Sequence, residues 1–149
     1  MKAKLESNIE ADEITLPAIP NSIPEFINFI VLHLNESCLD EKKIREISFA
    51  VEEALQNIIC FACKDGKGKM SISFSVNNAG DHIIEIKDNG IPFNILLAET
   101  FGELDDIFEP GEKPSNKMIK KTIKNIEYWR GGKKNTLTFT IPHNTTGIY

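Results

Sequence analysis

A carboxylate and a carboxamide lie one helical turn apart near the middle of the chain. Glu53 and Asn57 are four residues apart in a stretch whose apolar residues recur at helical spacing, so both should project from one face of a helix. A carboxylate can act as a general base, and an amide oxygen suits Mg²⁺, which prefers oxygen ligands. A simple polar pair on a helix surface has the same spacing. The pair therefore points to chemistry only if a second feature accompanies it.

The second feature is Asp88, with the Asn-Gly pair that follows it. The segment 82–87 alternates as a strand does, with Ile84 and Ile86 on one face, and Asp88 continues the parity of these two residues. We therefore expect Asp88 to point toward the covered side of a sheet and not into water. Taken alone, this tripeptide also fits a simple turn after a strand.

The composition is that of a globular domain. The chain has 149 residues, of which 41% are hydrophobic and 26% charged, so one domain with a real core is expected without help from metal or disulfides. The formal net charge of −5 argues against a general nucleic-acid binder, because such proteins neutralise phosphates with basic surfaces. We expect no direct contact with nucleic acid.

The cysteines and the apolar stretches indicate a cytoplasmic protein. Cys38, Cys60 and Cys63 are odd in number and scattered, which is typical of reduced thiols. No second Cys or His pair completes a zinc site with the C-x-x-C pair, so buried structural thiols are predicted. Residues 1–12 do not resemble a signal peptide, and the most apolar stretch, 26–34, is too short and too polar to span a bilayer.

The elements that must position these residues follow in the order strand, helix, helix, strand, strand, loop, helix, strand, strand. Ser22, Asp40 and Ser115 are candidate N-caps of the three helices. Because hairpins join most strands and the helices cluster, the pattern predicts an α+β two-layer sandwich, a mixed, mainly antiparallel sheet covered on one face by about three helices. The expected ranges are 13–18, 23–35, 41–62, 70–76, 82–87, 116–125, 126–130 and 137–141.

The expected helix 41–62 is apolar on two sides. One stripe runs along its length, and the opposite side, which holds Glu53 and Asn57, also carries Phe49, Ala50, Cys60 and Phe61. We expect a mostly buried helix in which the two polar residues form a notch.

The chain is expected to form one domain over 1–149, with a loose lead-in at 1–12, a long loop at 91–114 and a tail at 142–149. A loop of that length is often functional. Its acidic part, 98–109, also holds apolar residues that fit either packing onto the core or an exposed docking patch: Phe101, Leu104, Ile107 and Phe108. The lysines of the last helix indicate a solvated face or an acidic partner: Lys117, Lys120, Lys121 and Lys124.

Four segments together resemble one family. Residues 53–57 (EALQN) and 88–94 (DNGIPFN) are similar to two motifs of the GHKL, or histidine-kinase-like, ATPase superfamily. The Pro-Phe ending of the second motif resembles the branch of anti-sigma-factor serine/threonine kinases of bacteria. Residues 128–130 (YWR) and 132–138 (GKKNTLT) resemble the closing strands of that branch. The resemblance runs from Leu16 to Ile141, nearly the whole chain.

The resemblance implies the GHKL fold, ATP and Mg²⁺ as cofactors, and a role for each motif residue. Glu53 would be the catalytic base and Asn57 the metal ligand of the nucleotide site. Asp88 would accept a hydrogen bond from the adenine amino group, Gly90 would let the backbone approach the base, and Pro92 would belong to the same site.

The implied function is regulation of transcription. Members of this branch transfer phosphate to a serine of an anti-anti-sigma (STAS-type) protein and bind a sigma factor as a competing partner. They commonly form homodimers.

Three departures from the family pattern bear on ATP binding. Residues 113–117 (KPSNK) replace the glycine-rich run before the last helix, Phe61 replaces a histidine of many members, and the 98–109 region is acidic. ATP binding is then weak or absent, or the phosphates are held differently, by free amides at Ser115 and by the charges of Lys113 and Lys117.

Two other functions stay open. A pseudokinase would keep the fold and the partner surface without phosphate transfer, which the glycine-poor 113–117 segment favours. A histidine-kinase ATPase domain detached from its sensor ranks below both, because no helix with a phosphoacceptor histidine precedes the motifs.

Overall fold

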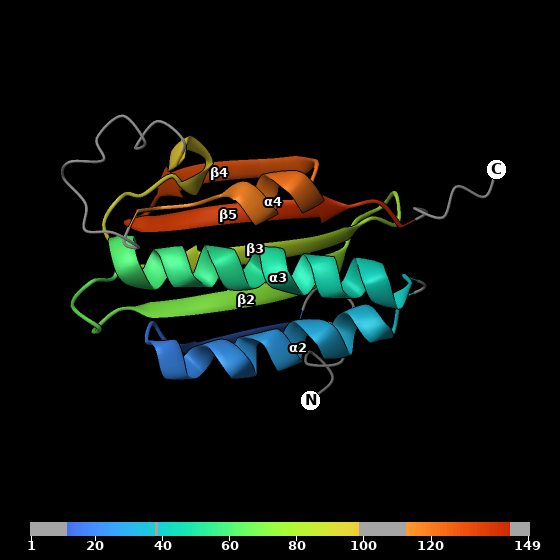
Figure 1. Ribbon diagram of the computed structural model, residues 1–149, viewed down its shortest axis with the longest axis horizontal. Helices are drawn as coiled ribbons and strands as arrows, with labels where there is room; N and C mark the ends of the chain where they lie inside the picture. Colours follow the sequence, from blue (N-terminus) through green and yellow to red (C-terminus); the bar gives the residue numbers. More distant parts are fainter. Residues whose placement is uncertain (1–11, 38, 99–112, 144–149) are drawn as a thin grey trace.

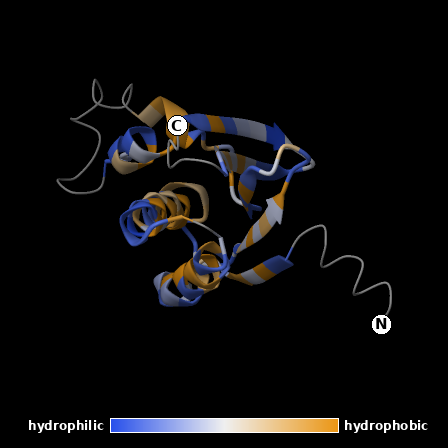
Figure 2. Cartoon of the chain, turned by 90° about the vertical axis from the view of Figure 1, so that its right-hand side faces the viewer, coloured by the Kyte–Doolittle hydropathy of each residue, from blue (hydrophilic) through white to orange (hydrophobic). Residues whose placement is uncertain are grey.

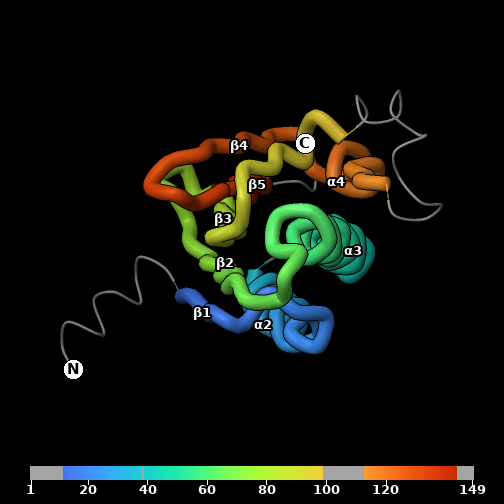
Figure 3. Tube along the Cα trace, turned by 90° about the vertical axis from the view of Figure 1, so that its left-hand side faces the viewer, coloured from blue at the N-terminus to red at the C-terminus, as the bar shows by residue number. Residues whose placement is uncertain are grey.

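The computed structural model describes residues 12–37, 39–98 and 113–143. They form two layers, a five-stranded sheet with three α-helices on one of its faces (Figure 1, Figure 3). The predicted α+β sandwich is confirmed. The sheet is not mixed, however, because all four pairs of neighbouring strands are antiparallel.

The sheet has the strand order β1-β2-β3-β5-β4. Its strands alternate between residues that face the helices and residues on the open face, and Figure 2 shows this as bands of hydropathy. The register pairs Asp88, at the end of β3, with Met70 on one side and Asn135 on the other. The strands are β1 (Asp12–Pro17), β2 (Lys69–Val76), β3 (His82–Asp88), β4 (Asn125–Gly131) and β5 (Lys134–Ile141).

The helices are α2 (Ile23–Asn35), α3 (Glu41–Asn57) and α4 (Lys117–Thr122). A 3₁₀ turn, η1 (Pro20–Ser22), precedes α2, and a π-helical turn, η2 (Ile58–Ala62), follows α3. Helix α3 lies between α2 and α4 and packs against both (Figure 3). The largest fully buried side chains fill the space between the layers: Phe26, Ile30, Leu34, Ile47, Leu55, Ile72, Ile84, Ile86, Ile119 and Phe139.

Of the three predicted helix caps, Asp40 is confirmed, and Ser22 and Ser115 are wrong. The Asp40 carboxylate accepts the N–H of Lys43 at 2.8 Å, as expected of an N-cap. Ser22 precedes α2 but makes no side-chain cap hydrogen bond. The reason is its backbone: φ −84° and ψ −16° are helical, whereas a capping residue is extended.

Two helix ends differ from the prediction. The helix expected to reach Ala62 is α-helical only to Asn57, and the π-turn completes it. Such turns are rare and often lie at functional sites. The last helix was expected over 116–125 but ends at Thr122, because Ile123 is already extended (φ −103°, ψ 120°) and leads into β4. Its N-cap position is Asn116, not Ser115.

The outer side of α3 and η2 is less covered than predicted. Phe49 is 46% exposed and Cys60 is exposed, so the prediction of a buried structural thiol holds only for Cys63. Burial raises the pKa of the Cys63 thiol to about 11, which leaves it unreactive. The four lysines of the α4 region are exposed, as predicted for a solvated face.

Several predictions concern residues outside the described part of the chain. They are the lead-in over most of 1–12, the acidic loop with its four apolar residues, Cys38, and most of the tail. Among the described residues, no helix is both long and apolar enough to cross a membrane.

Candidate functional site

Glu53 lies on α3, and its carboxylate binds the beginning of α4. Oε1 accepts the backbone N–H groups of Met118 and Ile119, both at 2.9 Å, and Oε2 accepts the hydroxyl of Ser115 at 3.0 Å. The first N–H groups of a helix have no acceptor within that helix, and here the carboxylate supplies one. Both oxygens of Glu53 are therefore used inside the protein.

Asn57, one turn further along α3, is buried and binds the same segment. Its Oδ1 accepts the backbone N–H of Ser115 at 3.1 Å, and its Nδ2 donates to the carbonyl of Ser115 at 3.1 Å. Nδ2 also donates to the carbonyl of Glu53 at 2.7 Å. The structure thus brings Glu53, Asn57 and Ser115 together, with their polar groups bonded to one another.

This arrangement corrects the expectation of free amides at Ser115. The amides of Ser115, Met118 and Ile119 already donate to Asn57 and Glu53 and are therefore not free. The side chain of Lys117 is exposed at the first position of α4.

Asp88 lies on the helix-facing side of the sheet, as its parity predicted, and is only 3% exposed. Its Oδ1 accepts the N–H of Gly90 at 2.8 Å and the side-chain amide of Asn135 at 2.9 Å, and Cys63 Sγ lies 3.9 Å away. In the described part of the chain, no hydrogen bond reaches Oδ2. Burial raises the pKa of Asp88, while the bonds from Asn135 and Gly90 oppose that rise.

Asn135 is a site residue that the sequence analysis did not single out. Its Nδ2 donates to Asp88 and to the carbonyl of Ile91 at 2.8 Å, and its Oδ1 accepts the N–H of Phe93 at 3.2 Å and the hydroxyl of Tyr128. One buried amide therefore joins β3, β4, β5 and the loop after β3.

A sequence signal for Asn135 exists. It has the parity of Leu137, Phe139 and Ile141, which all face the helices. A carboxamide on an otherwise apolar, buried face needs hydrogen-bond partners, and Asp88 is its partner in register.

Beside Asp88, between the sheet and α3, lies a small cavity of about 10 Å³. This volume is far below that of ordinary small-molecule sites, which are several hundred Å³. Phe93 closes one wall and stacks on Phe61, with ring centroids 5.5 Å apart. The lining residues are Ala54, Ile58, Ile86, Asp88, Phe93, Ile95, Tyr128, Asn135 and Leu137.

Gly90 and Pro92 lie on the loop beyond this cavity. A Cβ on Gly90 would lie 2.2 Å from the carbonyl oxygen of Ala62, so glycine is required by the protein's own packing at the end of η2. Pro92 is exposed and lines a wider hollow of about 700 Å³ instead of the cavity beside Asp88. The structure therefore does not bring Pro92 together with the buried carboxylate.

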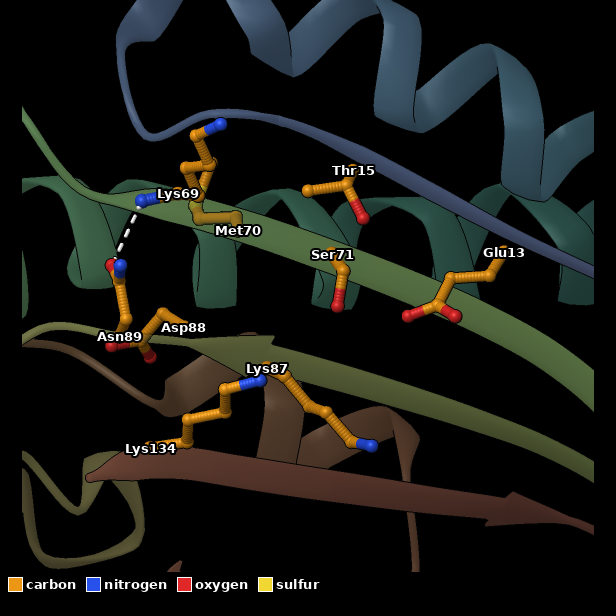
Figure 4. A pocket seen from close by; sticks show the side chains of 9 residues that line it. All are labelled: Glu13, Thr15, Lys69, Met70, Ser71, Lys87, Asp88, Asn89 and Lys134. Atoms are coloured by element: carbon orange, nitrogen blue, oxygen red, sulfur yellow. Dashed lines mark hydrogen bonds between the residues drawn. The ribbon is translucent and has the colours of Figure 1, made fainter. Parts of the chain in front are cut away.

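A separate hollow of about 250 Å³ lies on the open face of the sheet (Figure 4). Thr15, Ser71 and Lys87 line it from three neighbouring strands, and Lys69 donates its backbone N–H to the Asn89 side chain at its rim. It lies on the side of the sheet away from Glu53 and Asn57. Across all described residues, no cluster of three or more His, Cys, Asp or Glu side chains suits a metal ion.

Comparison with known families decides what kind of domain this is. A family model described as the histidine kinase-like ATPase domain matches residues 16–141. The chain belongs to this family. The match covers the same range as the predicted resemblance and includes both motifs, Asn135 and the segment 113–119.

Two solved structures share the fold. The structure of the RsbU and RsbW domains of Rv1364c from Mycobacterium tuberculosis has a TM-score of 0.61 at 18% identity, over 89% of this chain and 32% of that one. The histidine kinase domain of a blue-light-activated histidine kinase from Erythrobacter litoralis has a TM-score of 0.53 at 13% identity, over 86% of this chain and 62% of that one. This chain thus spans less than two thirds of either structure. None of the curated proteins matches it significantly.

An ATPase domain implies ATP as ligand, usually with Mg²⁺. The candidate site has two halves, Asp88 in one and Glu53 with Asn57 in the other, and they fit these groups differently. At Asp88, one carboxylate oxygen is held by the protein and the other is left to accept a ligand's N–H. At Glu53 and Asn57 the residue types suit a metal and an acceptor hydroxyl, but their atoms bind residues 115–119. Glu53 and Asn57 can therefore bind an acceptor hydroxyl and Mg²⁺ only after residues 115–119 have moved away from them.

Proposed function

We propose that this chain is an ATP-dependent protein serine kinase that phosphorylates an anti-anti-sigma (STAS-type) protein and sequesters a sigma factor. The observation that carries the proposal is the buried Asp88, which offers one free carboxylate oxygen beside a cavity in an ATPase fold. The Pro92–Phe93 ending and the 128–138 strands favour the anti-sigma branch, and the RsbU–RsbW structure shares the fold.

In the base half of the site, Oδ2 of Asp88 would accept a hydrogen bond from the adenine amino group. Asn135 and Gly90 hold the other oxygen, so the acceptor is oriented before the base arrives. Phe93 and Tyr128 must move apart to admit the base, because the cavity holds only about 10 Å³. Pro92 is proposed to line the mouth of this half.

In the phosphate half, ATP supplies the phosphoryl group and Mg²⁺ offsets its charge. Asn57 would present its amide oxygen to the metal, and Glu53 would take the proton of the acceptor serine. Lys117, exposed at the first position of α4, is proposed to meet the phosphates once the bonds of Ser115 to Glu53 and Asn57 are broken. Each of these steps requires displacement of residues 115–119.

Calorimetric titration with ATP and ADP, each with and without Mg²⁺, tests nucleotide binding directly. We expect magnesium-dependent binding in the micromolar range and its loss in Asp88→Asn, because an amide NH₂ directed at the base in place of Oδ2 would repel the adenine amino group. Asp81→Asn is the matched control, since Asp81 immediately precedes the opposite end of β3. Absence of heat and of thermal stabilisation at millimolar nucleotide would refute the proposal.

A pseudokinase is the second candidate, and one observation favours it. Every polar atom of the Glu53 carboxylate and the Asn57 carboxamide already has a partner within the protein. Incubation with labelled ATP and a cognate antagonist separates the two functions. Transfer of label to an antagonist serine supports the kinase, whereas tight antagonist binding without transfer supports the pseudokinase.

A further inference from the structure

Ser115 occupies the place that an acceptor serine would need. The hydroxyl substrate of a kinase donates its hydrogen bond to the general base, at about 2.6–3.2 Å between the heavy atoms. Ser115 Oγ donates to Oε2 of Glu53 at 3.0 Å, within that range. The chain's own serine thus stands at the proposed base in the ligand-free protein.

The same segment also holds the proposed metal ligand. Asn57 Oδ1 accepts the Ser115 N–H, and Asn57 Nδ2 donates to the Ser115 carbonyl, both at 3.1 Å. A metal ion and its bound phosphates need the space beside this oxygen, which the Ser115 backbone fills. Nucleotide and residue 115 therefore compete for Asn57.

The contacts with α4 strengthen this competition. Glu53 Oε1 accepts two first-turn amides, of Met118 and Ile119, and these bonds are charge-assisted. Together with the three bonds of Ser115, they fix residues 115–119 at five points on α3. Ile119 is fully buried in the core, so the segment is also held by packing.

We propose that residues 115–119 are an autoinhibitory segment, in which Ser115 acts as a pseudosubstrate that must leave Glu53 and Asn57 before Mg²⁺–ATP and an acceptor serine can bind. This inference rests on the proposed function. It differs from the sequence-based expectation in one measurable respect. A serine that helps to hold phosphate strengthens ATP binding, whereas a serine that competes with the nucleotide weakens it.

Ser115→Ala separates these two roles. Removing one hydrogen bond to a carboxylate should shift the closed–open equilibrium, and with it the apparent affinity for Mg²⁺–ATP, by roughly tenfold toward tighter binding. Ser115→Thr keeps a hydroxyl and should bind like the wild type. Ser75→Ala is the matched control, because Ser75 lies on β2 with the parity of the open face. The affinity is measured by calorimetry for all four proteins.

Amide hydrogen exchange tests the contact itself without nucleotide. In the wild type, the amides of Met118 and Ile119 should be protected, since their acceptor is Glu53. In Glu53→Ala the same amides should exchange much faster, because a helix offers its first N–H groups no other partner. Equal exchange in the two proteins would overturn the proposal whatever the nucleotide does.

The outcomes are distinguishable. Tighter binding in Ser115→Ala, restored to the wild-type value in Ser115→Thr, supports the autoinhibitory segment. Unchanged or weaker binding in Ser115→Ala, beside measurable binding in the wild type, overturns this inference and leaves the proposed function standing. No binding by any of the proteins overturns the proposed function, and the autoinhibitory role with it.

Discussion

Asp88, at the end of β3, and the Glu53–Asn57 pair, on α3, are the two polar parts of the candidate site, and they differ in what their side chains bind. At Asp88, Asn135 and Gly90 bind one carboxylate oxygen, no described hydrogen bond reaches the other, and the residue lines the small cavity. At Glu53 and Asn57, by contrast, the side-chain oxygens already accept hydrogen bonds from residues 115–119. The Asn57 amide also donates to the carbonyl of Ser115. The first site is preorganised, and the second is already occupied.

The difference shows what holds each site in place. The Asp88 carboxylate is held by Asn135 and Gly90, which keep their bonds when a ligand binds, so substitutions of these two residues should damage stability and binding together. The Glu53–Asn57 site depends on groups that must leave, so substitutions there should trade stability against binding.

Gly90→Ala should have the largest effect. A Cβ at this position would lie 2.2 Å from the carbonyl oxygen and 2.5 Å from the carbonyl carbon of Ala62, which are backbone atoms that cannot turn aside. We expect a loss of about 3 kcal/mol or more in the free energy of unfolding, measured in urea. Nucleotide binding should fall with it, because the Gly90 N–H holds Asp88.

Gly66→Ala is the matched control for this substitution. Gly66 has φ +71° and no atom within 4 Å of an added Cβ, so only the strained backbone conformation opposes the change. That strain amounts to about 1–2 kcal/mol. If the two variants were equally stable, close packing against Ala62 would not be what requires glycine at position 90.

Asn135→Ala should have the second-largest effect. It removes every hydrogen bond of a buried amide, including the bonds to the Asp88 carboxylate and to the Ile91 carbonyl. We expect a loss of about 2–3 kcal/mol and weaker ATP binding, because Asp88 loses the group that orients it. Thr136→Ala, one residue along β5 on the open face, should lose less than about 1 kcal/mol. A stable Asn135→Ala protein with normal ATP affinity would show that the Asp88 site is not preorganised in this way.

Asp88→Asn should have the smallest effect on stability, with a dependence on pH that identifies the buried charge. Burial raises the pKa of Asp88 in the folded protein, so the folded state binds this proton more tightly than the unfolded chain does. Its stabilising contribution is then complete below the unfolded pKa and is lost as the pH rises through the folded pKa. The stability of Asp88→Asn relative to the wild type should therefore increase from pH 3 to pH 7. The measurement is thermal unfolding of both proteins at each pH. If the difference in stability between Asp88→Asn and the wild type did not change with pH, burial of the Asp88 carboxylate would have no energetic cost.

The fold could be predicted from the sequence because its signals are local. The alternation of 70–76 and 82–87, the helical stripes of 23–35 and 41–57, and the cap at Asp40 each depend on neighbours in the chain. The errors lie where tertiary packing decides the ends. The π-turn after Asn57 and the early end of α4 at Thr122 are of this kind.

The candidate site could be predicted only in part, for the same reason. The parity of Asp88 and the spacing of Glu53 and Asn57 place these residues correctly on a strand and a helix. Their partners are distant in sequence: Ser115 is 58 residues from Asn57, and Asn135 is 47 from Asp88. No local pattern reveals that the amides of α4 already have an acceptor, or that a carboxamide on β5 fixes the carboxylate on β3.

The most direct test of the account is a crystal structure of the protein with Mg²⁺ and a non-hydrolysable ATP analogue. We expect the adenine amino group on Oδ2 of Asp88, with the Asn135 and Gly90 bonds unchanged. We also expect that Ser115 has left Glu53, and that Oδ1 of Asn57 faces the metal. A structure in which the nucleotide is bound while Ser115 still contacts Glu53 and Asn57 would contradict this account.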